Sequence, residues 1–174
     1  MKLTYKELDL NDDKDKKIMD RIISFDKNKD CFGDYDFYEV SDDYINLAVY
    51  IKNKLIGYVG IYHEDSIYYS KKGKYMITIC IREEYQSIGL GDIILKQTIN
   101  TLFNEFGAKT IEIEVVEDNY KCNKLVIKNH FIKDKKDTFL KEGEHVSSTH
   151  YVYTKDIYEK EQVHLKKYKK FIPY

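Results

Sequence analysis

Residues 75–92 read YMITICIREEYQSIGLGD, and this stretch constrains the fold more than any other part of the chain. Apolar residues at alternate positions predict a buried β-strand over residues 75–81. A short polar segment follows, and the sequence QSIGLG at residues 86–91 then opens a helix. The first N–H groups of a helix have no partner inside it and lie at the positive end of its dipole, so this segment is suited to bind phosphate.

The glycine pattern narrows the kind of phosphate ligand. The nucleotide-binding P-loop carries a Lys-Ser or Lys-Thr pair directly after its glycines, and no such pair follows Gly91. The spacing also departs from the Gly-x-Gly-x-x-Gly sequence of dinucleotide-binding folds. The loop is therefore not expected to bind a nucleoside triphosphate in the P-loop manner, and a dinucleotide is disfavoured.

The composition is that of a globular protein with its own core. The chain has 174 residues, of which 43% are hydrophobic, and we expect one domain over residues 1–174 with a basic C-terminal tail at 158–174. Its 29 basic and 30 acidic residues leave a net charge of −1, which argues against a nucleic-acid-binding protein. Three cysteines without metal-binding spacing indicate a reducing compartment and no metal site. We find no apolar signal segment or membrane span, and therefore expect a cytoplasmic protein with no membrane partner.

Hydrophobic periodicity predicts a mixed α/β (α+β) fold. Strands are expected at residues 2–10, 44–51, 55–63, 75–81, 110–116, 131–140 and 147–155. Helices are expected after a cap cluster at residues 11–13 and at residues 91–106, 119–129 and 159–170. A run of strands, then helix, strand, helix and a closing hairpin implies a mixed, mostly antiparallel central sheet with helices on both faces.

A second motif lies downstream and, together with the first, resembles a known family. Residues 119–131 read NYKCNKLVIKNHF, which is similar to the sequence Asn-x-x-Ala-x-x-Leu-Tyr-x-Lys-x-Gly-Phe of the GNAT N-acetyltransferases. Residues 79–91 resemble the acetyl-CoA-binding motif of that family, an aliphatic strand followed by Gln/Arg-x-x-Gly-x-Gly/Ala. The two motifs have the right order and separation, so they imply a GNAT fold, in which two parallel strands of the sheet splay apart.

The resemblance implies that acetyl-CoA is the co-substrate and indicates where it binds. Its pyrophosphate would be held by the backbone amides of Gln86, Ser87, Ile88, Gly89, Leu90, Gly91 and Asp92. The two glycines lack the Cβ atoms that would block its approach, and only the N–H of Asp92 would serve, because the carboxylate has the wrong charge. The pantetheine arm would pair with the strand edge at Ile79 and Ile81. Asn119, which is also expected to cap its helix, would lie near that arm.

Acetyl transfer to an amine needs a polarised thioester carbonyl and a proton acceptor for the amine, and the CoA thiolate must be protonated or leave as the anion. The resemblance implies the backbone N–H of Ile79 or Cys80 as the polarising group. Val126 stands where the family commonly has a tyrosine that donates a proton to the thiolate. Three alternatives follow. Tyr120 or Tyr153 supplies the missing hydroxyl, or the thiolate leaves unassisted, or the protein binds CoA without efficient transfer.

Acidic residues supply the candidates for the proton acceptor. Glu64 and His63 follow each other at the end of the strand expected at residues 55–63, where they would reach the cleft. Glu112 and Glu114 share one face of a later strand. The acidic loop at residues 26–43 would suit a cationic amine, and a solvated surface loop is the other interpretation.

We therefore expect an N-acetyltransferase that moves the acetyl group of acetyl-CoA to a primary amine by direct attack in a ternary complex. The acceptor would be a small-molecule amine or an amine of a peptide or protein, and the protein would be a monomer or a homodimer. The alternative is a non-catalytic acyl-CoA-binding or sensor module, which the valine at position 126 keeps open. Nucleic-acid binding by the basic run at residues 166–170 is the least favoured function.

Overall fold

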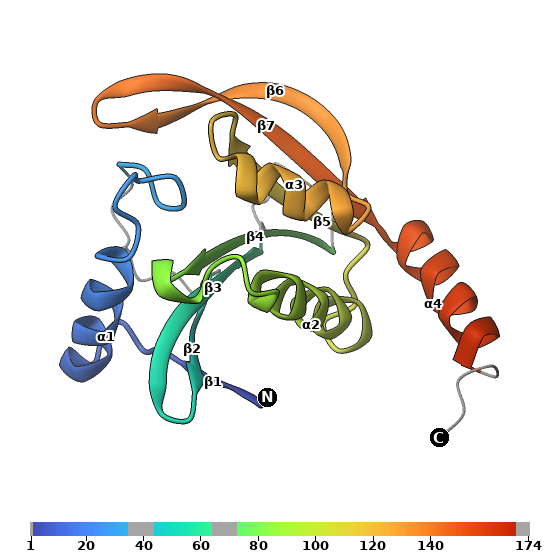
Figure 1. Cartoon of the computed structure of the whole chain (residues 1–174), viewed down its shortest axis with the longest axis horizontal. Coiled ribbons are helices and arrows are strands. Elements are labelled where there is room, and N and C mark those ends of the chain that lie inside the picture. The colour runs from blue at the N-terminus through green and yellow to red at the C-terminus, as the bar shows by residue number, and fades with distance from the viewer. Residues whose placement is uncertain (1, 35–43, 64–72, 170–174) are drawn as a thin grey trace.

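The computed structural model describes residues 2–34, 44–63 and 73–169 (Figure 1). Within these residues, the strands of one sheet are β1 (Leu3–Glu7), β2 (Tyr44–Ile51), β3 (Lys54–His63), β4 (Lys74–Ile81), β5 (Thr110–Val116), β6 (Ile132–Lys141) and β7 (Glu144–Thr154). The helices are α1 (Asp13–Ile23), α2 (Leu90–Asn104), α3 (Tyr120–Lys128), α4 (Lys155–Lys169) and a 3₁₀ turn, η1 (Glu83–Tyr85). The predicted order of elements is confirmed.

The sheet has the order β1-β2-β3-β4-β5-β7-β6. Neighbouring strands are antiparallel, except that β4 and β5 are parallel. The predicted mixed, mostly antiparallel sheet is therefore confirmed. The closing hairpin is also present, but its second strand, β7, lies between β5 and β6.

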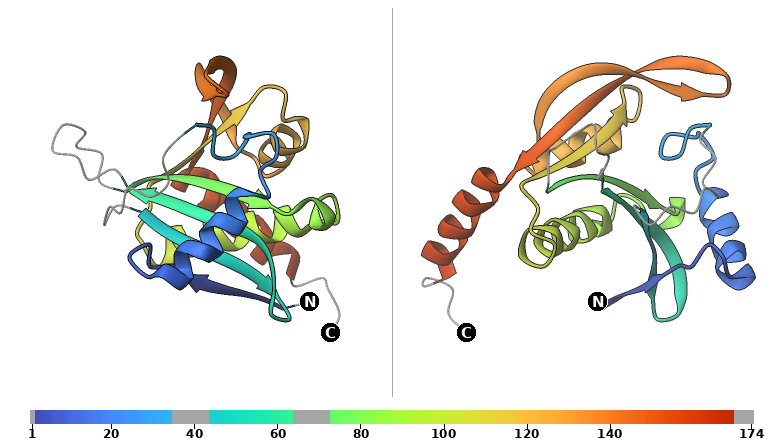
Figure 2. Two further views of the ribbon diagram at one scale, coloured as in Figure 1. Left: turned by 90° about the vertical axis from the view of Figure 1, so that its left-hand side faces the viewer. Right: turned by 180° about the vertical axis from the view of Figure 1, so that it is seen from behind.

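Helices cover both faces of the sheet (Figures 1 and 2). α2 and α3 pack over one face, where the larger core includes Ile94 and Leu102 of α2 and Val126 of α3. α1 packs on the opposite face, where Met19 and Ile22 join a second, smaller cluster. The two faces of β4 therefore meet different layers, and this arrangement positions the site described below.

The basic tail forms a helix that begins earlier than expected. α4 starts at Lys155, directly after β7, and its distal part extends away from the rest of the molecule (Figure 1). Its first turns are anchored, because the Tyr158 ring stacks on Phe103 with centroids 4.8 Å apart. Glu161 accepts a hydrogen bond from the Tyr153 hydroxyl at 2.8 Å.

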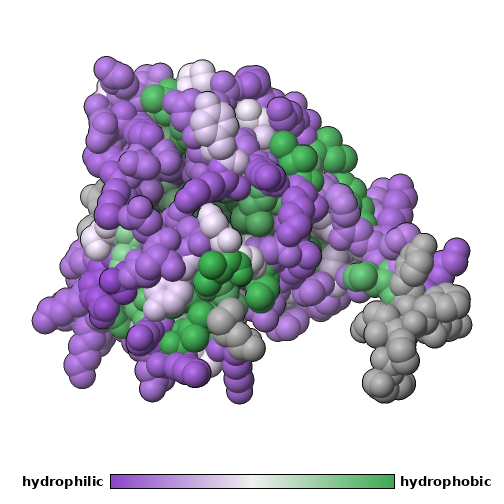
Figure 3. Space-filling view, in the orientation of Figure 1, coloured by the Kyte–Doolittle hydropathy of each residue, from purple (hydrophilic) through white to green (hydrophobic). Residues whose placement is uncertain are grey.

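The face of the molecule seen in Figure 3 is largely hydrophilic, and hydrophobic side chains form small patches on it. In the part of the chain that the structure describes, no helix combines the length and the hydrophobicity that crossing a membrane requires.

Candidate active site

β4 separates from β5 partway along its length. The parallel register covers Lys74↔Thr110, Tyr75↔Ile111 and Met76↔Glu112 and, among the described residues, goes no further. β4 continues to Ile81 and keeps a β3 partner at each position. From residue 77 onward, its other edge therefore faces a gap that β5 does not fill.

The backbone of Ile79 and Ile81 faces this open edge. Arg82 donates its N–H to the carbonyl of Ile56 at 2.9 Å, in continuation of the β3–β4 ladder. Since backbone groups of successive strand residues point to opposite edges, Cys80 directs its N–H toward β3. Ile79 and Ile81 direct theirs toward the gap.

Gln86 joins this edge to α3. Its side-chain amide donates to the carbonyl of Ile81 at 2.7 Å, and its side-chain oxygen accepts from the ammonium of Lys121 at 3.1 Å. A second contact to the edge comes from Cys31, whose thiol donates to the carbonyl of Ile79 at 3.5 Å. The N–H groups of the two isoleucines are then the donors that this edge can offer to a ligand.

The loop between η1 and α2 presents uncapped backbone donors. Gly89 is the N-cap residue of α2, has φ +87° and provides no side-chain cap. Ser87 also adopts positive φ, at 62°, and Ser87, Ile88 and Gly89 are all exposed. The N–H groups that open α2 are thus available to an oxygen-rich anion such as a pyrophosphate.

The two glycines of the loop have different surroundings in the protein. A Cβ on Gly89 would meet no protein atom within 4 Å, and the positive φ of this residue favours glycine. A Cβ on Gly91 would lie 3.2 Å from Leu125 and 3.4 Å from Ile81. Gly91 therefore allows α3 and β4 to pack closely on α2.

The carboxylate of Asp92 is occupied by groups of the protein. It accepts hydrogen bonds from Lys96 at 2.8 Å and from the Asn129 amide at 2.9 Å, and Lys128 lies 3.4 Å away. The bond from Lys96 is the largest cause that lowers the pKa of Asp92 to about 2, and the Asn129 bond acts in the same direction. The carboxylate thus ties the start of α2 to the end of α3, and only its N–H is left for a ligand.

Asn119 caps α3 as expected. Its side-chain oxygen accepts the N–H of Cys122 at 3.1 Å. Tyr120, the first residue of α3, is 77% exposed, so its hydroxyl points into solvent and away from the core.

Polar side chains form a cluster on the face of β5 that points away from α2 and α3, next to the β4–β5 gap. Glu114 accepts a hydrogen bond from the Ser148 hydroxyl at 2.5 Å. The Nε2 atom of His150 lies 3.6 Å from the Glu114 carboxylate and 3.4 Å from that of Asp137. Nδ1 of the same ring is buried and, within the described residues, has no hydrogen-bond partner. Glu112, on the same face of β5, is not part of this cluster and forms an ion pair with Lys74 at 3.0 Å.

The acidic residues of the loop after α1 mainly hold that loop in place. Asp26 accepts the N–H groups of residues 30, 31 and 32 at 2.9 Å. Asp30 pairs with Lys141 of β6 at 2.6 Å, and Asp34 accepts the N–H of Gly143 at 2.7 Å. These contacts fasten the loop to the β6–β7 hairpin. The rest of the predicted acidic loop, at residues 35–43, lies outside the described residues, as does Glu64.

Comparison with known proteins decides the family. The model of the acetyltransferase (GNAT) family matches residues 16–131, about two thirds of the chain. The chain belongs to the GNAT acetyltransferase family. No curated protein sequence gives a significant match.

Solved GNAT structures share the fold. A spermidine N-acetyltransferase from Vibrio cholerae in complex with CoA and spermine has 16% sequence identity and a TM-score of 0.72, with 90% of this chain and 98% of that chain covered. The aminoglycoside acetyltransferase AAC(6')-Ib in complex with coenzyme A has 16% identity and a TM-score of 0.56, with 68% and 70% covered. The family assignment confirms an N-acetyltransferase that uses acetyl-CoA.

Val126 of α3 stands at the position where GNAT enzymes commonly have a tyrosine hydroxyl. Val126 is fully buried in the core. The position of Tyr153, one of the two candidate substitutes, disfavours this role. It pairs with Ile111, at the closed end of the β4–β5 gap, and its hydroxyl is already bound to Glu161. Burial, followed by that bond, raises the pKa of Tyr153 well above its usual value.

The thiols near the gap are protonated at neutral pH. A hydrogen bond with Cys80, together with burial, raises the pKa of Cys31, and burial raises the pKa of Cys122 to about 12. A thiol in this state is a weak nucleophile, which disfavours a covalent acetyl-cysteine in this GNAT protein. Among the described residues, no group of three or more His, Cys, Asp or Glu side chains could hold a metal ion.

Proposed function

We propose that the protein transfers the acetyl group of acetyl-CoA directly to a primary amine, with both substrates bound at the β4–β5 gap. One observation carries this proposal: the open edge of β4 at residues 77–81 leads, through η1, into the uncapped start of α2. A strand edge that can pair with amides therefore lies next to N–H groups that can bind a diphosphate. When bound, acetyl-CoA supplies an activated thioester.

The cofactor-binding roles follow from this geometry. The N–H groups of Ile79 and Ile81 would pair with the pantetheine amides, and the N–H groups of Ser87, Ile88, Gly89, Leu90, Gly91 and Asp92 would hold the pyrophosphate. Gln86 acts as a positioning residue, because both ends of its side-chain amide are bound to the protein. Asn119 positions α3 beside the pantetheine arm.

The sequence leaves two candidates for the group that polarises the thioester carbonyl, the backbone N–H of Ile79 and that of Cys80. The β3–β4 register favours Ile79. Cys80 would have to leave the β3 ladder to offer its N–H, whereas Ile79 already faces the gap. A backbone donor held by a strand needs little reorganisation when charge develops on the carbonyl oxygen.

Among the residues that the structure describes, Glu114 is the group best placed to accept the proton of the amine. It lies two residues beyond Glu112, the last β5 residue that pairs with β4, and it therefore flanks the gap. Residues 111, 113 and 115 of β5 are buried in the α2–α3 layer, so the side chain of Glu114 projects to the other face, from which an amine can approach. Ser148 and His150 hold its carboxylate.

Neither the Tyr120 nor the Tyr153 hydroxyl is positioned to protonate the thiolate. Tyr120 is exposed at the first turn of α3, and Tyr153 is bound to Glu161 at the other end of the gap. We therefore favour departure of the thiolate without a side-chain proton donor, which its ordinary pKa of about 8.5 permits.

We propose a small cationic amine as the acceptor. The two carboxylates beside His150 would attract a positive charge, and the similar structures are those of a spermidine N-acetyltransferase and an aminoglycoside acetyltransferase. We also propose a single-domain cytoplasmic protein that is a monomer or a homodimer.

Thiol release from acetyl-CoA with spermidine, an aminoglycoside and a peptide amine tests the acceptor class. Release with the peptide alone would contradict it.

A non-catalytic CoA-binding module is the second candidate. The observation that favours it is the buried valine at position 126 together with the bound hydroxyl of Tyr153. CoA binding without thiol release on any amine would select this function.

A further inference from the structure

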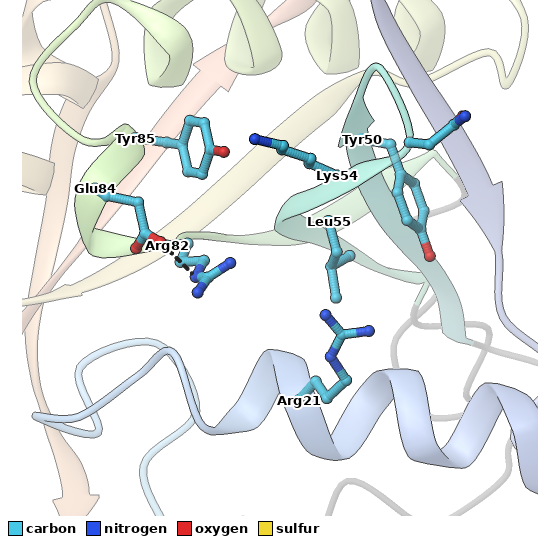
Figure 4. A pocket seen from close by; sticks show the side chains of 8 residues that line it. Arg21, Tyr50, Lys54, Leu55, Arg82, Glu84 and Tyr85 are labelled. Carbon is cyan, nitrogen blue, oxygen red and sulfur yellow. Dashed lines mark ion pairs between the residues drawn. The ribbon is translucent and has the colours of Figure 1, made fainter.

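A basic pocket is lined by residues other than those assigned above to the β4–β5 gap. Its volume is about 430 Å³, and it opens between the end of α1, the β2–β3 turn and η1 (Figure 4). Arg21, Lys54 and Arg82 line it from these three directions, together with Glu84. The three cations against one carboxylate leave a local excess of positive charge in a chain whose net charge is −1.

Two of these cations have no counter-charge among the residues that the structure describes. Arg82 pairs with Glu84 at 2.8 Å, and its guanidinium lies 5.4 Å from the centre of the Phe25 ring. The side chains of Arg21 and Lys54 form no hydrogen bond or ion pair with any residue that the structure describes. In Figure 4, Arg21 reaches from α1 toward the same space into which Lys54 and Arg82 point.

The chemistry of the lining indicates the class of ligand. Guanidinium groups match the oxygens of a phosphate with paired hydrogen bonds, and an ammonium adds a point charge. The volume is in the range of pockets that hold small molecules. The side chains of Leu55, Tyr50 and Tyr85 complete the wall and can contact the organic part of such a ligand.

We propose that this pocket binds the phosphate group of a small molecule other than the CoA held at the gap. Leu55 belongs to the cluster on the α1 side of the sheet, whereas Leu90, at the start of α2, belongs to the cluster on the opposite side. The pocket and the cofactor loop are lined by different residues, and Tyr85 of the pocket packs against the same cluster as Leu90. They are connected through η1, because Glu84 and Tyr85 directly precede Gln86.

Titration calorimetry with inorganic pyrophosphate tests this proposal on the full chain saturated with CoA, at an ionic strength of about 0.15 M that screens diffuse attraction. The double variant Arg21→Gln/Lys54→Gln removes the pocket cation of α1 and that of the β2–β3 turn. The matched control Lys14→Gln/Lys17→Gln removes the same charge from exposed positions of α1. We expect one site per chain, a loss of affinity of about tenfold or more in the double variant, and binding within about twofold of the unmodified chain in the control.

Circular dichroism establishes whether each variant folds, and the single variant Arg21→Gln, at an exposed position, repeats the test should the double variant be unfolded. The proposal is overturned by any of three results: no pyrophosphate binding to the CoA-saturated chain, undiminished binding in the folded pocket variant, or an equal loss in the control. Because the measurement does not involve acetyl transfer, its outcome is independent of the proposed activity.

Discussion

The side-chain amide of Gln86 donates a hydrogen bond to the carbonyl oxygen of Ile81 at 2.7 Å and thereby closes the turn between β4 and the start of α2. The same side chain accepts a hydrogen bond from Lys121 of α3. The three elements that surround the proposed cofactor site are thus held by one residue. Its removal should loosen the loop without emptying the core.

Replacement Gln86→Ala should weaken CoA binding. The loss of two hydrogen bonds that order the loop is expected to cost about 1–2 kcal/mol, or about five- to thirtyfold in Kd. Titration calorimetry with CoA measures it. Gln162→Ala, in α4, is the control and should leave the Kd unchanged, while an unaltered Kd in the Gln86 variant would contradict the positioning role.

Gly89→Ala should lower both stability and CoA affinity. An alanine at φ +87° is strained by about 1–2 kcal/mol, although its Cβ meets no atom within 4 Å. Gly107→Ala is a matched control, because Gly107 has φ +67° and open space around it but lies at the other end of α2. Both variants should lose similar unfolding free energy in urea. Only the first should bind CoA more weakly, and equal CoA affinity in the two would argue against the loop as the diphosphate site.

Asp92→Asn should change how stability depends on pH. The folded pKa of Asp92, about 2, is below the ordinary aspartate value of about 3.9, so its charge stabilises the folded state above pH 4 and this contribution is lost as the pH falls toward 2. At pH 7 the variant should be less stable by about 1 kcal/mol, the scale of a partly exposed ion pair. Urea unfolding at pH 7 and at pH 3 should show the difference shrinking. A difference that grows at low pH would contradict the depressed pKa.

Glu114→Gln should reduce turnover with little effect on CoA binding. A proton acceptor typically contributes about 10²- to 10⁴-fold to the rate, so kcat/KM for the amine should fall by that range. Glu112→Gln is the matched comparison, because Glu112 shares the strand and the face but pairs with Lys74. It should lose much less activity. Equal losses in the two variants would remove Glu114 from the proposed role.

The two tyrosines should respond differently to loss of their hydroxyls. Tyr120→Phe should change kcat by less than about threefold, because its hydroxyl is exposed and not needed for the thiolate. Tyr153→Phe should lower the unfolding free energy by about 1 kcal/mol, because the bond to Glu161 is lost, and should leave kcat unchanged. A loss of kcat of a hundredfold or so in either variant would identify a proton donor.

Local sequence patterns predicted most of the framework. The alternation of apolar residues along β4, the uncapped glycine at the start of α2 and the cap at Asn119 are all properties of short segments, and the structure contains each of them. The parallel β4–β5 pair and its splay required the resemblance to the family, since no local pattern encodes where two strands separate.

Contacts between distant segments were the part that the sequence did not predict. The close approach of Gly91 to Leu125 and Ile81 depends on how α3 and β4 pack on α2, which no local pattern indicates. His150 was overlooked because its proximity to Glu114 depends on β7 lying beside β5, which the hairpin pattern alone does not determine. The sequence indicates no partner for the Tyr153 hydroxyl, whereas in the structure this hydroxyl donates to Glu161 of α4.

A rapid-quench measurement of acetyl-CoA consumption, with and without spermidine, tests direct transfer at the gap. We expect free thiol and N-acetylated amine to appear together in equal amounts, only when the amine is present, and we expect no acetylated protein by mass spectrometry. Thiol release with acetylation of the protein in the absence of amine would contradict direct attack in a ternary complex.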